Sequence, residues 1–329
     1  MNNKKWFPFI ILLMAFSLAA CKPQRSDQQG TNSGRIRIVA AIFPAWDWTR
    51  NILGENPADM ELTLLLDNGV DLHSYQPSVE DILTIGSCDL FIYVGGESDQ
   101  WVTDALKQAA NPNIRVLKML DAVGEAAKEE ETVEGMQAEA EEDEEDAEYD
   151  EHIWLSLRNA GVICDAIAAE LSALDPAHAA LYTANAAAYR AKLDTLDAAY
   201  REAVSAAPLK TLLFGDRFPF RYLTEDYGLD YYAAFSGCSA ETEASFETIT
   251  FLAQKVNELD LSAVLTIDGT DHRIARTVVQ STEAKDQEVL TLDSMQSVTA
   301  QDIQNGASYL SVMESNLDVL KQALSREEN

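Results

Sequence analysis

From residue 35 onward, short apolar runs alternate with longer amphipathic segments. Residues 35–43, RIRIVAAIF, are rich in isoleucine and valine, and residues 60–66, MELTLLL, form a similar run. Such near-continuous apolar runs are typical of strands that are covered on both faces of a parallel sheet. The same interpretation applies to six later runs. We therefore expect strands at residues 35–43, 60–66, 88–95, 114–120, 210–216, 230–235, 263–268 and 288–293.

The segments between these runs have the spacing of amphipathic helices. Ser78 is suited to cap a helix over residues 78–86, because its hydroxyl can accept a backbone N–H of the first turn. Further helices are expected at residues 46–53, 99–109, 154–174, 245–259, 272–284 and 305–324. Alternating strands and helices predict an α/β fold with a parallel sheet flanked by helices. The pattern occurs twice, so we expect an N-terminal lobe over residues 36–174 and a C-terminal lobe over residues 208–329.

One long helix is expected over residues 175–207, between the two lobes. Asp175 and Pro176 form a favourable start, because aspartate caps a helix and proline suits its first position. No glycine interrupts the segment before Pro208. At about 1.5 Å per residue, the helix would extend roughly 45 Å, which is long enough to join both lobes. Its larger apolar side chains recur along one face, namely Tyr189, Leu193, Leu196, Tyr200 and Val204.

Residues 1–20 are typical of a bacterial secretion signal of the lipoprotein type. Two lysines precede an apolar core, and Leu-Ala-Ala then leads to Cys21. We expect cleavage before Cys21, acylation of that cysteine, and a flexible leash over residues 21–35. The protein would then be extracytoplasmic and lipid-anchored to the cell membrane, on the periplasmic side in a Gram-negative cell. A single-pass anchor with an incidental cysteine is the alternative.

The formal net charge of −31 argues against nucleic acid as a partner, because the two would repel each other. Much of this charge is local, since residues 129–151 contain 14 acidic residues and no lysine or arginine. A block of like charges repels itself and packs poorly, so residues 125–151 are expected to form an acidic mobile loop. The loop could be only a solvated tether, or its carboxylates could capture cations weakly.

Histidines and aspartates follow several of the expected strands. His73 comes after the second strand, His152 follows the acidic block, and Asp216, Asp268 and Asp293 end three later strands. Ligands of open parallel sheets bind beyond the carboxyl ends of the strands, so these side chains could meet in a cleft between the lobes. Imidazole and carboxylate together suit Zn²⁺, Mn²⁺ or Fe²⁺. Each residue also has a plainer explanation, because lone histidines often lie on the surface and strand-end aspartates often cap helices.

The other histidines and the cysteines add less. His178 lies among alanines in the first turn of the long helix and should face solvent, and His272 could face the cleft or water. Cys88 and Cys164 lie in apolar surroundings, whereas Cys238 lies in a polar loop; one disulfide among them is possible outside the cytoplasm. Neither a GxSxG nor an HExxH motif is present. A hydrolase that pairs Cys238 with a histidine is a remote alternative.

Four segments resemble the solute-binding proteins of zinc and manganese ABC transporters, the cluster A-I group with a rigid helix between its lobes. The segments GVDLHSYQPSVEDI and DEHIWLSLRNA are similar to the family's D-x-H-x-Y-x-P and D-x-H-x-W-L-S motifs. The other two are the long helix that begins with Asp-Pro and residues 305–324. The resemblance covers nearly the whole mature chain and implies one metal ion between the lobes. Many family members carry a histidine-rich acidic loop before the second motif, whereas this chain has the acids without the histidines.

The resemblance also implies which residues hold the metal. His73 and His152 match the first two ligands, Asp293 matches the fourth, and Asp268 matches another acidic strand end near the cleft. The third ligand position falls on Arg217, in GDRFPFRYLTEDYGL. A guanidinium has no lone pair to offer and stays charged. The third ligand is therefore absent or replaced.

Asp216 is one candidate for the replacement, and Cys238 and His272 are less favoured substitutes. Arg217 itself would pair with one of the strand-end carboxylates, Asp216, Asp268 or Asp293, and orient it beside the metal. Two neighbours of His73 are candidates for fixing its ring, namely Asp71 and Tyr75.

The function that the resemblance implies is capture of a metal ion without catalysis. We expect a monomeric, lipid-anchored receptor that binds Zn²⁺, with Mn²⁺ as the alternative, and delivers it to an ABC permease driven by a cytoplasmic ATPase. Three other functions remain open from the sequence: the same role for manganese or iron, surface adhesion with a structural metal, and a secreted metal-dependent hydrolase.

Overall fold

The computed structural model describes residues 35–54, 60–137, 148–239 and 243–326. The expected secretion signal, Cys21 and all of the expected leash except Arg35 lie outside these ranges. Among the described residues, no helix is long and apolar enough to cross a membrane.

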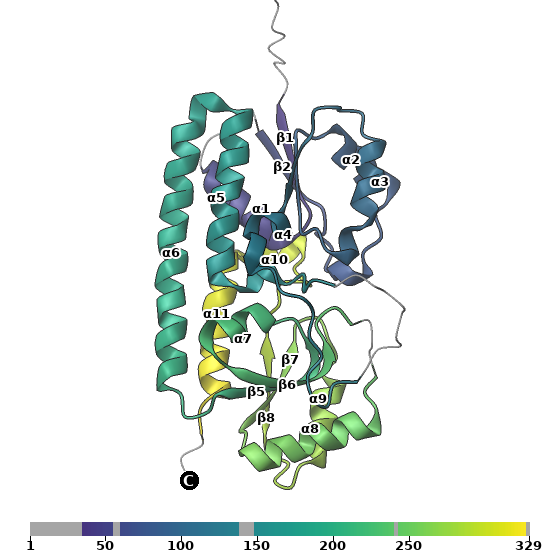
Figure 1. Ribbon diagram of the computed structural model, residues 1–329, viewed down its shortest axis with the longest axis vertical. Helices are drawn as coiled ribbons and strands as arrows, with labels where there is room; N and C mark the ends of the chain where they lie inside the picture. The colour runs from purple at the N-terminus through teal and green to yellow at the C-terminus, as the bar shows by residue number, and fades with distance from the viewer. Residues whose placement is uncertain (1–34, 55–59, 138–147, 240–242, 327–329) are drawn as a thin grey trace, which may run out of the picture. The chain divides into compact units, whose positions relative to one another are not determined.

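Two four-stranded parallel sheets form the framework (Figure 1). In the N-terminal lobe the strands lie in the order β2-β1-β3-β4, with β1 (Ile36–Ala40), β2 (Met60–Leu64), β3 (Leu90–Tyr93) and β4 (Arg115–Lys118). In the C-terminal lobe the order is β6-β5-β7-β8, with β5 (Thr211–Phe218), β6 (Asp230–Ser236), β7 (Ala263–Ile267) and β8 (Glu288–Leu292). The two sheets thus repeat one topology, and the expected α/β fold is confirmed.

Helices cover both sheets. In the N-terminal lobe, α1 (Phe43–Leu53), α2 (Val79–Ser87) and α5 (Leu157–Leu174) pack on the strands, and α3 (Trp101–Lys107) packs on α2. In the C-terminal lobe, α8 (Phe246–Leu259), α9 (Arg273–Ser281) and α11 (Tyr309–Ala323) do the same. Three short helices, α4 (Met119–Val123), α7 (Arg221–Tyr227) and α10 (Ala300–Gln304), were not expected from the pattern. Each has at most two turns, which is too short to show a clear period.

The long helix α6 (Ala179–Ala206) follows a 3₁₀ turn, η5 (Pro176–His178). It packs against α1 and α5 of the N-terminal lobe and against α7 and α11 of the C-terminal lobe (Figure 1). All five apolar side chains expected along its inner face are buried. The buried Tyr200 hydroxyl donates to the Met313 carbonyl at 2.6 Å, which ties α6 to α11. The helix therefore contacts both lobes along its length.

A buried polar junction links elements that come from opposite ends of the chain. Asp47 in α1 is fully buried, and its Oδ2 accepts the Tyr309 backbone N–H of α11 at 3.1 Å and the Tyr189 hydroxyl of α6 at 3.4 Å. The Trp48 and Tyr309 rings meet edge to face at 4.9 Å. Since α1 belongs to the first lobe and α11 to the second, the core is continuous across the lobes at this point.

Hydrogen bonds connect the flanks of the acidic segment to the rest of the protein, and the expected mobility of residues 125–151 stays a prediction. Glu129 and Tyr149 form an antiparallel bridge, and the Gln137 N–H donates to the Ala234 carbonyl of β6 at 2.9 Å. The Lys128 N–H also donates to the Tyr222 hydroxyl at 2.9 Å. These hydrogen bonds give partners to the backbone N–H and C=O groups of the flanks, which would otherwise need water. The central residues 138–147 lie outside the described ranges.

Candidate metal centre

A short 3₁₀ turn, η1 (Leu72–Ser74), carries His73 beyond the end of β2. Asp71 caps this turn, because its Oδ1 accepts the His73 backbone N–H at 3.0 Å. Leu72 is buried in the core and anchors the turn. Leucine and histidine therefore point in different directions from the turn, and the histidine ring contacts Ser98 and His152.

The second imidazole is fixed by a carboxylate two residues before it. His152 is fully buried at the start of η4 (Ile153–Leu155). Asp150 Oδ1 accepts both the His152 backbone N–H at 2.8 Å and its ring Nδ1 at 2.9 Å. A carboxylate at Nδ1 holds the proton there and leaves the Nε2 lone pair free for an electrophile. Although burial opposes it, the Asp150 charge raises the pKa of His152.

The two imidazoles meet with their Nε2 atoms 3.1 Å apart. Two nitrogen ligands of a tetrahedral zinc ion, each at about 2.0–2.1 Å, would be separated by about 3.3 Å. On its other side, His73 Nδ1 lies 2.8 Å from Ser98 Oγ and 3.5 Å from Glu151 Oε2. Burial and the charge of the neighbouring His152 lower the pKa of His73 to about 3, so His73 is neutral at physiological pH. The pair therefore has the spacing of two ligands in a metal site.

A cysteine completes the cluster. Cys238 lies just beyond β6, and its Sγ and the imidazole nitrogens of His73 and His152 all lie within 4.8 Å of one another. Among the described residues, this is the group of histidine, cysteine and acidic side chains whose geometry could hold a metal ion. Burial and the nearby carboxylates of Glu130 and Asp150 raise the pKa of the Cys238 thiol well above its ordinary value. The thiol is therefore protonated when no cation is bound.

Two strand-end carboxylates of the C-terminal lobe accept hydrogen bonds within that lobe. Asp216 Oδ2 accepts the hydroxyls of Thr266 at 2.6 Å and Thr270 at 2.8 Å. Asp268 accepts the backbone N–H and the hydroxyl of both Ser294 and Ser297. These bonds occupy the lone pairs of both carboxylates and tie the ends of neighbouring strands and loops together. The structure does not bring Asp216 or Asp268 into the histidine cluster.

Asp293 differs from its two neighbours. Its Oδ1 accepts the Met295 backbone N–H at 2.7 Å, and it too lies outside the histidine cluster. Burial, reinforced by the negative charge of Asp268, raises the pKa of Asp293 to about 7. Its assignment as a ligand stays a prediction, as does that of Asp268.

Arg217 does not pair with a strand-end carboxylate, which corrects the expectation from the sequence. Its Nη2 donates to Asp71 Oδ2 at 2.5 Å, and Asp216 Oδ1 accepts only the Arg217 backbone N–H, at 2.9 Å. The reason is that both Asp216 oxygens already accept hydrogen bonds, from hydroxyls at Oδ2 and from a backbone N–H at Oδ1, whereas Asp71 uses only Oδ1 for the His73 backbone N–H. Tyr75, also expected near the His73 ring, packs edge-on against Trp101 with ring centroids 5.8 Å apart.

Two cavities adjoin His73. One, of about 380 Å³, is lined by His73 and Cys238 together with Glu97, Glu130, Glu148 and Glu151. The other, of about 360 Å³, is lined by His73, Arg217 and His272 among others, so His272 does reach the edge of the cleft. The acid-lined cavity places the metal-site ligands beside carboxylates, which attract cations.

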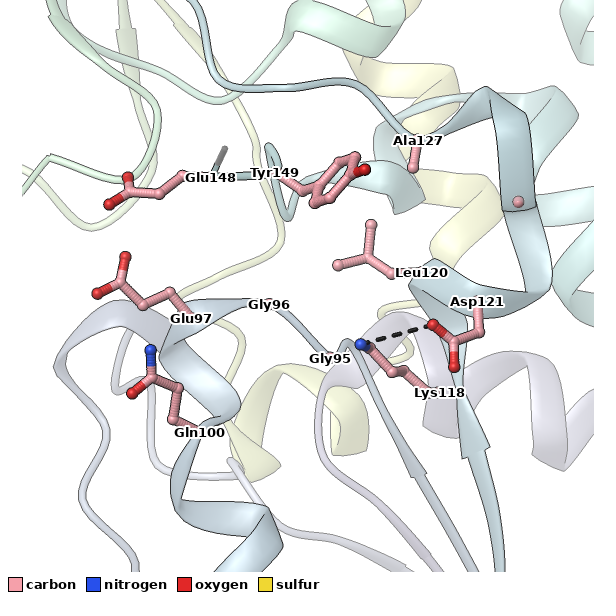
Figure 2. A pocket seen from close by; sticks show the side chains of 11 residues that line it. Gly95, Gly96, Glu97, Gln100, Lys118, Leu120, Asp121, Ala127, Glu148 and Tyr149 are labelled. Atoms are coloured by element: carbon pink, nitrogen blue, oxygen red, sulfur yellow. Dashed lines mark ion pairs between the residues drawn. The ribbon is translucent and has the colours of Figure 1, made fainter. Parts of the chain in front are cut away.

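A larger cavity of about 620 Å³ lies next to the acid-lined one and shares Glu97 and Glu148 with it (Figure 2). Figure 2 shows these two glutamates extending their carboxylates to the same side of the opening. Lys118 and Asp121 form an ion pair at its other side. Carboxylates therefore line a path from the surface toward the histidine pair.

The remaining histidine and cysteines lie away from the cluster. His178 is exposed, and its Nδ1 lies 2.6 Å from Asp175 Oδ2, as expected for a residue that faces solvent. Cys88 and Cys164 are buried in the core, and all three described cysteines are free thiols. The possible disulfide is therefore absent among these three.

Sequence reasoning missed three residues that support the imidazoles. Ser98 lies at His73 Nδ1, Asp150 holds His152, and Glu151 reaches both Ser98 and His73. A signal for Asp150 was present, because the DEHIWLS segment places a carboxylate two residues before the histidine. Nothing in the sequence pointed to Ser98, since only the fold brings the segment that follows β3 next to the turn that carries His73.

Comparisons with known proteins agree with this geometry. The chain is 31% identical over 325 residues to the zinc-binding lipoprotein AdcA of Streptococcus pneumoniae, covering 98% of this chain and 62% of that protein. It is 26% identical to the high-affinity zinc uptake system protein ZnuA of Bacillus subtilis, covering 98% of both. The crystal structure of the Zn(II)-bound ZnuA-like domain of S. pneumoniae AdcA superposes with a TM-score of 0.70 at 28% identity, over 89% of this chain and all of that one.

The chain thus spans less than two thirds of the pneumococcal protein but nearly the full length of the Bacillus one. Residues 38–323 match the family described as ZnuA, zinc-uptake complex component A, periplasmic. That match covers both lobes, the long helix and every residue of the cluster, and the chain therefore belongs to the ZnuA family of zinc-uptake complex components.

Proposed function

We propose that this protein is an extracytoplasmic solute-binding protein that captures Zn²⁺ between its two lobes for high-affinity uptake. The convergence of the His73 and His152 Nε2 atoms at 3.1 Å carries this proposal. The zinc-binding descriptions of the AdcA and ZnuA relatives support the choice of metal. Zinc accepts imidazole nitrogen in a tetrahedral site and binds such sites more tightly than manganese does.

Proton positions in the pair are suited to taking up a cation. Without the ion, one Nε2 donates to the other, and the Ser98 hydroxyl lies at His73 Nδ1. Binding requires a lone pair on both Nε2 atoms, so the His73 proton moves to Nδ1, which faces Ser98 Oγ and Glu151 Oε2. Glu151 and Asp150 then each accept from one ligand ring.

The ion is cargo in this function, and the protein carries out no chemical conversion. After capture, the loaded protein docks on an ABC permease that a cytoplasmic ATPase drives. Membership in a zinc-uptake family supports this role, and the sequence around Cys21 supports a lipid anchor at the outer face of the cell membrane. We expect the protein to act as a monomer, and the three residues of the cluster all come from one chain.

Zinc titration of His73→Ala and His152→Ala proteins by competition with a chromogenic chelator tests the site. Each substitution should weaken binding by more than the roughly 10–100-fold that losing an outer partner of a ligand costs. His178→Ala is the matched control, because His178 is exposed and pairs only with Asp175 among the described residues. Wild-type affinity in both of the first two variants would contradict the proposed site.

Transport is tested separately. A strain without the gene should grow poorly under zinc chelation, and wild-type protein should restore growth, whereas His152→Ala should not. Restoration by manganese instead of zinc would contradict the proposed cargo.

A further inference from the structure

Arg217 occupies the strand position where the resemblance implies a metal ligand, and it contacts both ligand-bearing loops. Its Nη2 donates to Asp71 Oδ2 at 2.5 Å, and its Nη1 donates to the Ser239 carbonyl at 3.4 Å. Asp71 fixes the backbone of His73, and Ser239 directly follows Cys238. Arg217 therefore ties the loop that carries His73 to the loop that carries Cys238.

We propose that the Cys238 thiolate is the third metal ligand of this chain, and that Arg217 is a positioning residue for the resulting site of two histidines and one cysteine. The inference rests on the proposed function and extends it, because it names the ligand that stands in for the missing one and the class of ion that the site accepts. From the sequence alone, Asp216 is the favoured replacement ligand and Cys238 a less favoured one.

The geometry favours sulfur over the neighbouring carboxylates. Cys238 Sγ lies within 4.8 Å of the nitrogens of both His73 and His152. With Zn–S at about 2.3 Å and Zn–N at about 2.0–2.1 Å, a tetrahedral ion would need about 3.6 Å between sulfur and nitrogen. The 4.8 Å within which the three ligand atoms lie exceeds this separation by at most about 1.2 Å, whereas Asp216 is held by Thr266 and Thr270.

Gly237 lets the cysteine loop lie against the buried imidazole. A Cβ at this position would approach His152 Cε1 to 3.1 Å and the Phe218 carbonyl oxygen to 2.8 Å. Contacts this close require a side chain no larger than hydrogen, because the carbonyl belongs to β5 and cannot move easily. The backbone beside Cys238 is therefore shaped to bring the thiol next to His152.

A second observation points to a cation in the same place. Glu151 is 1% exposed, and its Oε2 has no hydrogen-bond donor among the described residues, although it lies 3.5 Å from His73 Nδ1. A buried carboxylate oxygen without a donor is costly. A cation on the far side of the His73 ring would bring a positive charge toward this carboxylate, across a ring whose Nδ1 lies 2.8 Å from Ser98 Oγ and 3.5 Å from Glu151 Oε2.

Binding to sulfur exchanges a proton for the ion. The S–H bond breaks, sulfur keeps the electron pair and donates it to the cation, and the proton leaves to solvent. Thiolate is a soft ligand that selects zinc, whereas manganese prefers carboxylate and water oxygens. A site with a thiolate should therefore accept zinc and discriminate against manganese more strongly than a site of imidazoles and carboxylates.

Cobalt(II) substitution tests the sulfur ligand directly. The purified full chain loaded with Co²⁺ should show a near-ultraviolet sulfur-to-cobalt charge-transfer band. Cys238→Ser should lose this band while it keeps visible d–d bands of a cobalt ion held by the two imidazoles. Zinc affinity of Cys238→Ser should fall beyond the roughly 10–100-fold typical of an outer partner. An unchanged spectrum and affinity in Cys238→Ser would overturn the proposal.

Alkylation gives an independent measurement on the wild-type protein, so it does not depend on whether a variant folds. Iodoacetamide at alkaline pH should modify Cys238 slowly in the metal-free protein, because burial keeps its thiol protonated, and Zn²⁺ should slow this modification further, as measured by a peptide mass spectrometry time course. Cys88 and Cys164 are buried in the core and serve as internal controls that should stay unmodified in both states. Equal modification of Cys238 with and without zinc would overturn the proposal.

The positioning role of Arg217 has its own readout. Arg217→Gln should weaken zinc binding by about 10–100-fold and reduce the charge-transfer intensity, and Arg217→Lys should restore part of both because it keeps the charge facing Asp71. If the two histidine variants lose zinc but Cys238→Ser does not, the inference fails and the proposed function stands. If the wild-type protein itself binds no zinc, the proposed function fails.

Discussion

The carboxyl edges of the two sheets invite comparison because the sheets share one strand order. At the N-terminal edge, the His73 ring nitrogens contact Ser98 and His152, and Glu151 Oε2 has no hydrogen-bond donor among the described residues. At the C-terminal edge, Asp216 and Asp268 are saturated by hydroxyl and backbone donors. Ligand candidates thus follow the matching edge strands β2 and β6, whereas the carboxylates at the inner strands β5 and β7 make structural hydrogen bonds.

This difference shows that a polar residue at a strand end predicts that its side chain lies at the sheet edge. It does not predict whether that side chain binds an ion or makes hydrogen bonds within the protein. A carboxylate that accepts three or four hydrogen bonds has no lone pair left for an ion unless those bonds break. The C-terminal lobe contributes to the cluster through Cys238, which comes from the loop beyond its edge strand β6.

Removing the most saturated carboxylate should have the largest effect. Asp268→Ala leaves four donors from Ser294 and Ser297 without an acceptor, and it should lower the free energy of unfolding by about 4 kcal/mol. Denaturant unfolding measures this, with Asp271→Ala as a control because Asp271 is exposed in the same loop. A loss under 1 kcal/mol would mean that these bonds contribute little, and the contrast between the edges would disappear.

A buried acid of the N-terminal edge, Asp99, should destabilise the fold when it is charged, whereas Asp268 stabilises it. Asp99 is 3% exposed, and burial raises its pKa to about 6. Because the folded state holds the proton more tightly than the unfolded one, the resulting stabilisation is present below pH 4 and is lost as the pH rises through 6. Relative to Asp99→Asn, the wild-type protein should therefore lose up to about 3 kcal/mol of stability over that range.

Urea unfolding of both Asp99 proteins between pH 4 and pH 7 checks this sign. The difference between them cancels the titration of other groups. A wild-type protein that gains stability relative to Asp99→Asn as the pH rises would show that Asp99 is held in its charged form.

The ion pair that joins the two edges should contribute less. Arg217 and Asp71 are both largely buried and meet across the lobe boundary, so their coupling energy in a double-mutant cycle with Arg217→Gln and Asp71→Asn should be about 1–2 kcal/mol. Thermal unfolding of the four proteins measures it. Coupling near zero would mean that this ion pair does not help to hold the two edges together.

Substitution of Asp293 should have the smallest effect, which is a small change in zinc affinity. It lies outside the cluster of His73, His152 and Cys238, so Asp293→Asn should change zinc affinity less than Cys238→Ser does. Competition titration of both variants compares them directly. A loss in Asp293→Asn as large as that in Cys238→Ser would restore Asp293 to the ligand set and make the two edges more alike than the structure indicates.

The sequence by itself determined the strands, the long helix and the two histidines. Hydrophobic periodicity is local and strong in these elements, as the five buried side chains along α6 show. The pairing of His152 with Asp150 was also within reach, because it spans only two residues. Short helices such as α7 and the pairing of the acidic segment's flanks were not predicted, because neither shows a local period.

Only the tertiary structure decided the third member of the cluster and the partner of Arg217. Cys238 lies 165 positions from His73 along the chain, and Asp71 and Arg217 are separated by 146 positions. Whether a carboxylate stays free depends on donors that the fold brings to it, such as Thr266 and Thr270 at Asp216. Residue type and spacing do not identify those donors, because hydrogen bonds between distant segments form only when the lobes pack.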